Sequence, residues 1–336
     1  MRTAIFENDH QIQYPDAVCF CFNPQEITIQ TDSIISISIS ANGETCVDTR
    51  HSYSGKVYAD ISYYMRSFFS ISENLLESIF ISVEVSSSTD SFSFTTHCIW
   101  GAINIGEVFN DSRIVTWFRN FPFTFSLFIE EEGTTVSVCY DGNEYKTKSL
   151  PAGLNHINVS EWFPFAKEFV VIGLEGNRAN GTFDYTFDYT FGIAINDGYV
   201  NKIVIDNSKC GIYLRWIDRH GFYQYWLFQE GDNMLQIETD GELLYQDYSD
   251  DRYSYWGVNR YHAKIMQKTI KACATLVDWN TINMLSTLCS SPLVDLYFSR
   301  KWIPVKLSNK TFTRSWKPLQ NFEIEIVLPE IISQRL

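Results

Sequence analysis

The side chains that most often perform catalysis or bind metals are scattered along this sequence. Its six histidines occur in no HxH, HxxxH or HExxH arrangement, so they form no metal-binding motif. There is no GxSxG nucleophile elbow, no phosphate-binding glycine-rich loop and no dinucleotide fingerprint. We therefore expect a protein that is not an enzyme and that uses no metal or other cofactor.

The many carboxylates could indicate one class of enzyme, a glycosidase. A glycosidase needs two carboxylates about 5 to 9.5 Å apart across the scissile bond. With 40 Asp and Glu residues such pairs arise by chance, so their presence does not indicate this chemistry. Asp184 and Asp188 offer oxygens suited to Ca²⁺, but an exposed polar strand face explains them better.

The cysteines give no metal-binding pattern either. None of the eight forms a CxxC pair, and the spacing of Cys19 and Cys21 suits one face of a strand better than a zinc knuckle. We expect buried, reduced thiols, because cysteine usually behaves as a small hydrophobic residue.

The densest group of binding-type side chains lies in residues 211–228. The pattern predicts a β-hairpin with its polar turn at residues 218–221. Aromatic residues, Trp216 and Trp226 among them, occupy both faces of this hairpin. Either the hairpin is enclosed by the rest of the fold, or one face contacts a partner, where Trp, Tyr and Arg are preferred anchors. Asp218 and Arg219 are alternatively explained as a simple pair across the turn.

Strands must position these residues, because hydrophobic side chains recur at every second position. Residues 35–40 read ISISIS, and residues 121–129 repeat the alternation with Phe, Leu and Ile. Residues 141–143 predict a hairpin turn, and residues 182–191 form an aromatic repeat that alternates with Thr and Asp. Residues 323–326 end the pattern with another alternating strand.

Helical patterns are few. Residues 72–80 predict a short helix. Residues 278–288 predict a better one, with Asp278 as its N-cap and Pro292 preventing its continuation.

Size and composition bound the protein class. The 336 residues are 45% hydrophobic and 16% aromatic, which excludes intrinsic disorder. No apolar run approaches the roughly 20 residues that span a bilayer, and the first residues lack the apolar region of a signal peptide. A formal net charge of −14 argues against a free nucleic-acid binder.

These patterns predict an all-β protein of mainly antiparallel β-sandwich domains. We expect one β-sandwich in residues 1–95 and a second in 96–205. Residues 206–336 are expected to form a β domain with one packed helix near 278–289.

Charge is distributed unevenly. Residues 252–336 hold 12 basic and 5 acidic residues, whereas residues 230–251 hold eight acidic residues and no basic one. Solvated faces of unlike domains explain this pattern. Alternatively, the acidic body of one subunit meets the basic end of a neighbour, because complementary patches guide assembly.

Several segments resemble tail structural proteins of bacteriophages and prophages of Bacteroides-type bacteria. The resemblance rests on residues 21–24 (CFNP), 100–107 (WGAINIGE), 117–123 (WFRNFPF), the 214–226 hairpin, 291–297 (SPLVDLY), 302–305 (WIPV) and the closing strand. It implies a tail-tube-like, distal-tail-like or baseplate-like fold. It further implies a structural protein that self-assembles into a ring and joins neighbouring tail proteins.

From this resemblance we expect a homo-oligomer, either a ring, a trimer or a hexamer, whose partners are other tail or baseplate proteins. DNA would pass transiently through its channel. The protein would belong to the virion tail and be assembled in the host cytoplasm. The candidate interface residues are Trp216, Asp218, Arg219, Trp226, Arg252, Arg260, Lys264, Lys268 and Lys271.

A second function remains open from the residues alone. A carbohydrate-binding adhesin or receptor-binding module would stack sugars on aromatic strands, with the repeat around residues 183–191 as its binding surface.

Overall fold

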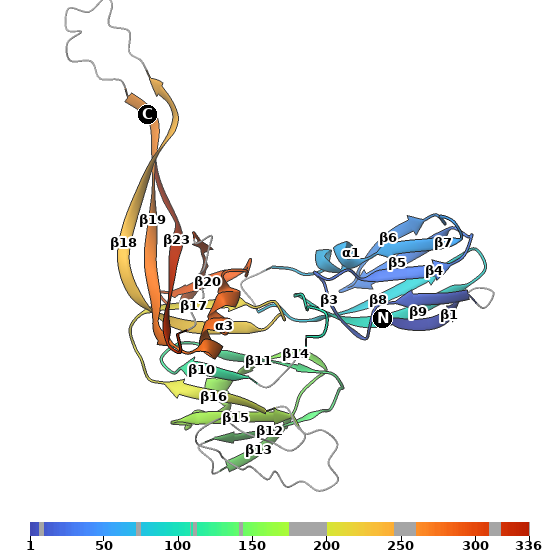
Figure 1. Cartoon of the computed structure of the whole chain (residues 1–336), viewed down its shortest axis with the longest axis horizontal. Helices are drawn as coiled ribbons and strands as arrows, with labels where there is room; N and C mark the ends of the chain where they lie inside the picture. Colours follow the sequence, from blue (N-terminus) through green and yellow to red (C-terminus); the bar gives the residue numbers. More distant parts are fainter. Residues whose placement is uncertain are drawn as a thin grey trace, which may run out of the picture. The chain divides into compact units, whose positions relative to one another are not determined.

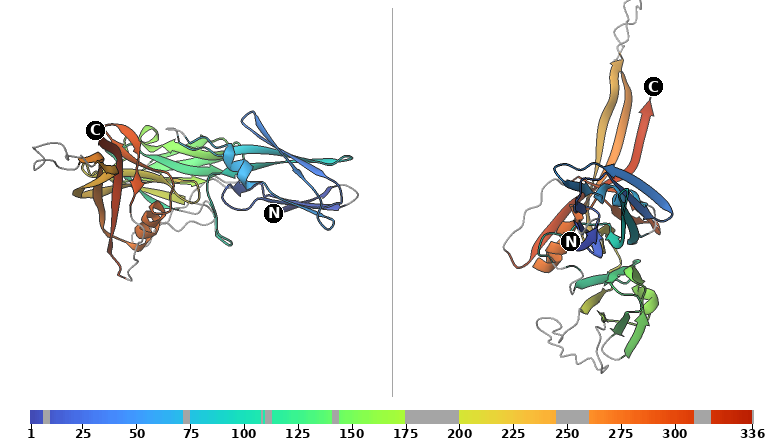
Figure 2. Two further views of the ribbon diagram at one scale, coloured as in Figure 1. Left: turned by 90° about the horizontal axis from the view of Figure 1, so that it is seen from above. Right: turned by 90° about the vertical axis from the view of Figure 1, so that its right-hand side faces the viewer.

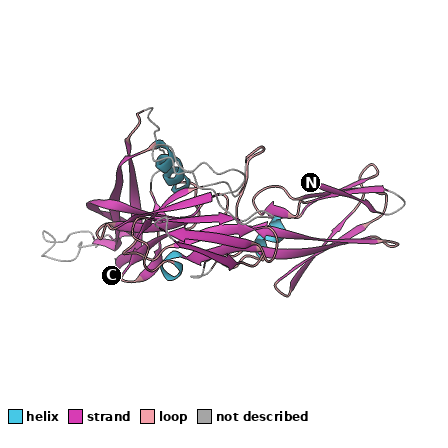
Figure 3. Ribbon diagram, turned by 90° about the horizontal axis from the view of Figure 1, so that it is seen from below, coloured by secondary structure: helices cyan, strands magenta, loops and turns pink. Residues whose placement is uncertain are grey.

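Strands dominate this computed structural model (Figure 3). It describes residues 1–6, 10–71, 75–107, 109, 113–140, 144–174, 200–244, 260–308 and 317–335. The helices found in this part of the chain are α1 (Ser62–Ser67), α2 (Val159–Trp162) and α3 (Trp279–Leu288). The expected all-β fold with a helix near the C-terminus is confirmed.

The chain forms two compact units. Unit 1 comprises Met1–Ser208 and Ile217–Tyr223, and unit 2 comprises Lys209–Trp216 and Gln224–Leu336. The chain therefore leaves unit 2 at Trp216, contributes a short segment to unit 1, and returns at Gln224.

The expected domain boundaries compare with these units as follows. The boundary expected between residues 205 and 206 lies close to the end of the first long segment of unit 1. The boundary expected between residues 95 and 96 falls inside strand β9 (Ser91–Ile99), which stays within one sheet. The division into three domains stays a prediction.

The first part of unit 1 is a β-sandwich (Figure 1). One sheet has the order β1 (Arg2–Phe6), β2 (His10–Tyr14), β4 (Glu26–Gln30), β7 (Lys56–Asp60). The other has the order β3 (Val18–Phe20), β9, β8 (Ile79–Ser86), β5 (Ile35–Ala41), β6 (Glu44–Arg50). Burial follows the expected alternation, since Ile35, Ile37 and Ile39 are fully buried and the serines between them are partly exposed.

The second part of unit 1 contains a five-stranded sheet and a two-stranded ladder. The sheet has the order β10 (Ile114–Phe118), β16 (Val200–Asp206), β15 (Phe169–Leu174), β12 (Thr135–Tyr140), β13 (Glu144–Ser149). The ladder joins β11 (Thr124–Ile129) to β14 (Gly153–Asn158). Because Ser126 and Phe128 are buried as well as Phe125 and Leu127, β11 is enclosed on both faces rather than half-exposed.

One expected helix is wrong. In the segment 72–80, the described residues 75–78 have no helical structure, and Ile79 and Phe80 begin strand β8. Ile79 and Ile81 are buried while Phe80 is exposed, so the period is that of a strand. The turn expected at 141–143 and the aromatic repeat at 182–191 lie outside the described residues.

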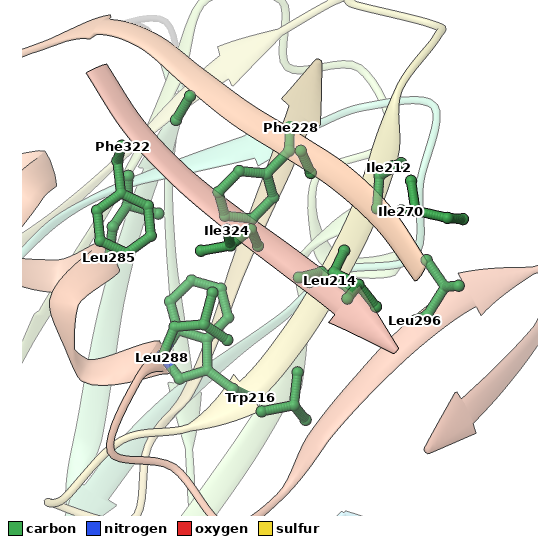
Figure 4. Packing of buried hydrophobic residues seen from close by; sticks show 14 of the residues in the cluster. Ile212, Leu214, Trp216, Phe228, Ile270, Leu285, Leu288, Leu296, Phe322 and Ile324 are labelled. Carbon is green, nitrogen blue, oxygen red and sulfur yellow. The ribbon is translucent and has the colours of Figure 1, made fainter. Parts of the chain in front are cut away.

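Unit 2 is built on a seven-stranded sheet that α3 covers. The strand order is β21 (Lys301–Pro304), β20 (Val294–Phe298), β17 (Ile212–Ile217), β18 (Tyr223–Leu244), β19 (Arg260–Val277), β23 (Gln320–Arg335), β22 (Lys306–Leu307). Asp278 caps the helix as expected, because its side chain accepts a hydrogen bond of 2.7 Å from Thr281 N. Ile282, Leu285 and Leu288 bury one helix face against the sheet, and Figure 4 shows Leu285 and Leu288 in this cluster.

Three strands of this sheet are unusually long and continue past the helix (Figures 1 and 2). β18 has 22 residues, β19 has 18 and β23 has 16, against a typical strand of about five or six. We call the outer part of these strands, residues 233–244, 260–268 and 327–335, the arm. The arm is antiparallel throughout, with β19 between the other two strands.

Candidate assembly interface

The hairpin expected at residues 211–228 is present, and its turn is organised by Asp218. The backbone N–H of Asp218 donates to Phe222 O at 2.9 Å. Its side-chain Oδ1 accepts from the N–H groups of His220 and Phe222, both at 2.9 Å. Asp218 therefore stabilises the turn through bonds to its backbone groups.

Arg219 and His220 instead contact Glu107. Arg219 Nη2 donates to Glu107 Oε1, and His220 Nε2 lies 3.0 Å from the same oxygen. Partial burial raises the pKa of Glu107, but the N–H of Asn104 and the charges of His220 and Arg219 outweigh it, so the pKa lies below its usual range. The contact holds residues 104–107 to the hairpin turn within unit 1.

Two glycines allow the turn to pack closely. A Cβ at Gly101 would overlap Arg219 O, and one at Gly221 would lie 2.5 Å from Ile99 Cγ2. Gly221 also has φ +80°, which disfavours other residues. Phe222 follows at once and is buried in a cluster with Phe20, Ile99 and Phe128. The hairpin turn is thus part of the core of unit 1.

A closed ring of hydrogen bonds fixes the end of this turn. Leu76 N donates to Tyr223 Oη at 3.0 Å, and Tyr223 N donates to Ser126 Oγ at 3.1 Å. Ser126 Oγ lies 3.0 Å from His156 Nδ1, and His156 Nε2 lies 2.7 Å from Leu76 O. Because Leu76 O only accepts, His156 carries its proton on Nε2, and its Nδ1 accepts from Ser126. Ser126 and His156 therefore both take part in this ring, and Ser126 is buried.

Arg113 completes this cluster. Its guanidinium carbon lies 4.0 Å from the ring centre of Phe222, and its Nη2 donates to Ser126 O. Burial lowers the pKa of Arg113 to about 10, although the negative charge of Asp218 opposes that shift. The sequence contained no local indication of this contact, which joins residues 109 positions apart.

Trp216 and Trp226 belong to the core of unit 2. Trp216 is completely buried, and its Nε1 donates to Thr287 Oγ1 on α3 at 2.9 Å (Figure 4). Trp226 is partly buried and packs against the same cluster. Burial removes Trp216 from the side chains that a partner can contact, so the expectation of an interface role for it is corrected.

Arg215 is buried on the face of β17 opposite to that of Trp216. Its Nε donates to Asp295 Oδ2 at 2.8 Å, and its guanidinium lies 4.5 Å from the ring centre of Trp302. The strand register explains this ion pair, because Arg215 of β17 lies directly opposite Asp295 of β20.

The basic candidates lie on the central strand of the arm and its base. Arg260, Lys264, Lys268 and Lys271 all belong to β19, and Arg252 lies outside the described residues. Residues 230–244 of the acidic segment belong to the adjacent strand β18. The complementary charges that we expected to join two subunits thus lie on neighbouring strands of one chain, and Lys271 Nζ is 4.0 Å from Glu325 Oε1 on β23.

One face of the arm combines apolar side chains with two of these lysines. Leu235 and Ile237 of β18 are 60% and 65% exposed. They lie opposite Lys268 and Met266, and Lys264 lies opposite Thr239. Even-numbered residues of β19 share a face, so this surface continues the face that Ile270 and Ala272 bury in the core. We call Leu235, Ile237, Lys264, Met266 and Lys268 the arm face.

The described part of the chain contains no group of three or more His, Cys, Asp or Glu side chains arranged to hold a metal ion. No helix within the described ranges is long and apolar enough to cross a membrane.

Comparisons with known proteins do not assign the chain to a family. No protein-family profile matches it, and no curated protein matches it. Among solved structures, tandem immunoglobulin domains A164–A165 of titin share 8% identity over 59% of this chain and 96% of theirs, with a TM-score of 0.21. A bacterial ice-binding adhesin shares 14% identity over 76% of this chain and 88% of its own, with a TM-score of 0.16. A Ca²⁺-stabilised adhesin of an Antarctic bacterium covers 96% of this chain and 89% of its own at 10% identity, with a TM-score of 0.17. Likenesses of this size carry no functional argument.

Proposed function

We propose that this chain is a non-enzymatic structural subunit of a bacteriophage tail or baseplate. In this proposal it self-assembles into a ring and joins neighbouring tail proteins. The sequence resemblance supports the tail assignment, and the exposed arm face supports the assembly role.

The arm face carries the assembly part of the proposal. Soluble proteins seldom leave large apolar side chains such as Leu235 and Ile237 side by side on an open strand, because such edges invite pairing with another chain. A short β17 leaves the outer part of β18 without a neighbour on that side among the described strands. A second subunit that covered this surface would bury the apolar side chains and would pair the open edge of β18.

The proposal is tested by measuring mass and shape on the full-length protein. Mass photometry and negative-stain microscopy at micromolar concentration should show a closed ring, a trimer or a hexamer. The double variant Leu235→Asn, Ile237→Asn should dissociate it, because an interface loses most affinity when its apolar centre is replaced. Val47→Asn is the matched control, since Val47 is equally exposed, at 62%, on β6 of unit 1.

A wild-type protein that stays monomeric throughout the micromolar range would overturn the assembly role. Glycan binding by that monomer would favour the carbohydrate-binding adhesin instead. Rings formed by a protein whose gene is not beside tail genes, such as that of a tape-measure protein, would keep the assembly role and overturn the tail assignment.

A further inference from the structure

Three thiols meet in the first β-sandwich of unit 1. Cys19 lies on β3 and is directly opposite Cys98 of β9 in a parallel ladder. Cys21 follows two residues after Cys19, and its N–H donates to Ile99 O at 3.0 Å. All three side chains are buried, at 4%, 0% and 0% exposure.

The ladder places Cys98 between the other two thiols. The N–H of His97 donates to Ala17 O, and Ile99 O accepts from Cys21, so the residues flanking Cys98 make the bonds to β3. Cys98 itself has its side chain on the face that Cys19 and Cys21 share. Its thiol therefore lies beside those of Cys19 and Cys21.

We propose that Cys98 and Cys19 form a disulfide when the protein meets an oxidant, with Cys21 as an alternative partner. Directly opposed residues of adjacent strands have the short Cα–Cα separation that a disulfide needs. The structure holds these cysteines as free thiols. This inference does not depend on the assembly role.

The chemistry balances with hydrogen peroxide as the oxidant. The Cys19 thiolate attacks one peroxide oxygen, breaks the O–O bond and becomes a sulfenic acid, and the other oxygen leaves as water after protonation. The Cys98 sulfur then attacks the sulfenic sulfur, and the second water leaves with the remaining proton. Two thiols and one peroxide thus give one disulfide and two waters.

The pKa values of the three thiols favour these roles. The neighbouring Cys98 thiol is the largest influence on the pKa of Cys19 and lowers it, and it also lowers the pKa of Cys21. The pKa of Cys98 is raised by its contacts with both thiols and by burial. Cys19 is therefore the better thiolate nucleophile and Cys98 the thiol that completes the bond.

Access to the trio is provided by the position of β3. It has only three residues and lies at the edge of its sheet, where β9 is its one neighbour among the described strands. Short edge strands open locally at lower free energy than central strands, and such opening exposes Cys19 and Cys98 together.

The test is peptide mapping of the full-length protein after treatment with hydrogen peroxide, acid quenching and alkylation under denaturing conditions. We expect a peptide pair joined through Cys19 and Cys98. Cys98→Ala should abolish every cross-link to β3, whereas Cys19→Ala should move the link to Cys21. Cys289→Ala, which removes an exposed thiol of unit 2, is the control and should leave the link unchanged.

A measurement on the wild-type protein covers the case in which a variant does not fold. The oxidised protein should unfold at a temperature higher by about 5 °C or more, and dithiothreitol should reverse the increase. Absence of a link in the trio, or links confined to Cys210 or Cys289, would overturn the proposal.

Discussion

At the scale of single residues, Gly221 decides whether the hairpin turn fits into unit 1. Gly221→Ala combines a left-handed φ with a contact of 2.5 Å to Ile99 Cγ2. We expect a loss of about 3 kcal/mol in the free energy of unfolding, measured by chemical denaturation. Gly133→Ala is the control, because φ is +83° there and nothing lies within 4 Å of the added Cβ, so its cost should be about 1 kcal/mol. Equal effects of the two variants would show that the turn is not closely packed.

His97 makes the stability of unit 1 depend on pH. It is buried, with its ring 3.9 Å from that of Phe80, and desolvation lowers its pKa from 6.5 to about 4. The unfolded chain binds the proton more readily than the folded one, so the contribution is complete above pH 6.5 and is lost as pH falls toward 4. The expected loss is about 3 kcal/mol. Denaturation measured across this interval should show it, and the slope should be shallower in His97→Gln. An unchanged slope would contradict the prediction.

At the scale of elements, the stability of α3 depends on its N-cap residue Asp278 as well as on its buried hydrophobic face. Asp278→Ala removes the acceptor for Thr281 N and should lower stability by about 1 kcal/mol. Asn280→Ala, at an exposed position of the same helix, should change stability by less than about 0.5 kcal/mol or increase it slightly. Thermal unfolding followed by circular dichroism measures both, and equal losses would mean that the capping bond does not contribute.

The arm shows why charge pattern and structure must be considered together at this scale. The acidic β18 and the basic β19 are adjacent, but their register does not place unlike charges opposite each other. Lys264 and Lys268 lie opposite Thr239 and Leu235, whereas Glu238 and Asp240 lie opposite Ile265 and Ala263. The arm face thus offers a partner the lysines Lys264 and Lys268 as well as the exposed Leu235 and Ile237. The alternating hydrophobic pattern of the sequence did not indicate a role for Leu235 or Ile237.

At the scale of the whole molecule, two compact units predict two unfolding transitions. Ile37→Ala in unit 1 and Leu285→Ala in unit 2 remove side chains that are fully buried. Each should cost about 2 to 5 kcal/mol and should shift only the transition of its own unit in calorimetry. A single transition that both variants shift equally would show that the units unfold as one.

Sequence alone determined the class of the fold and much of its local structure. Alternation in residues 35–40 predicted a strand with buried isoleucines, and the cap and spacing in residues 278–288 predicted α3. These predictions succeeded because period and capping depend on neighbours a few residues apart. The helix expected at 72–80 was wrong, because Ile79 and Phe80 pair with β9 and this pairing overrides a weak helical preference.

Only the tertiary structure decided the roles of the hairpin residues. Trp216 is equally suited to a core or an interface, and its bond to Thr287, 71 residues away, placed it in the core. Tyr223 meets Leu76 across 147 residues, and Cys98 meets Cys19 across a parallel ladder. Such contacts depend on which strands become neighbours, and no local period encodes that choice.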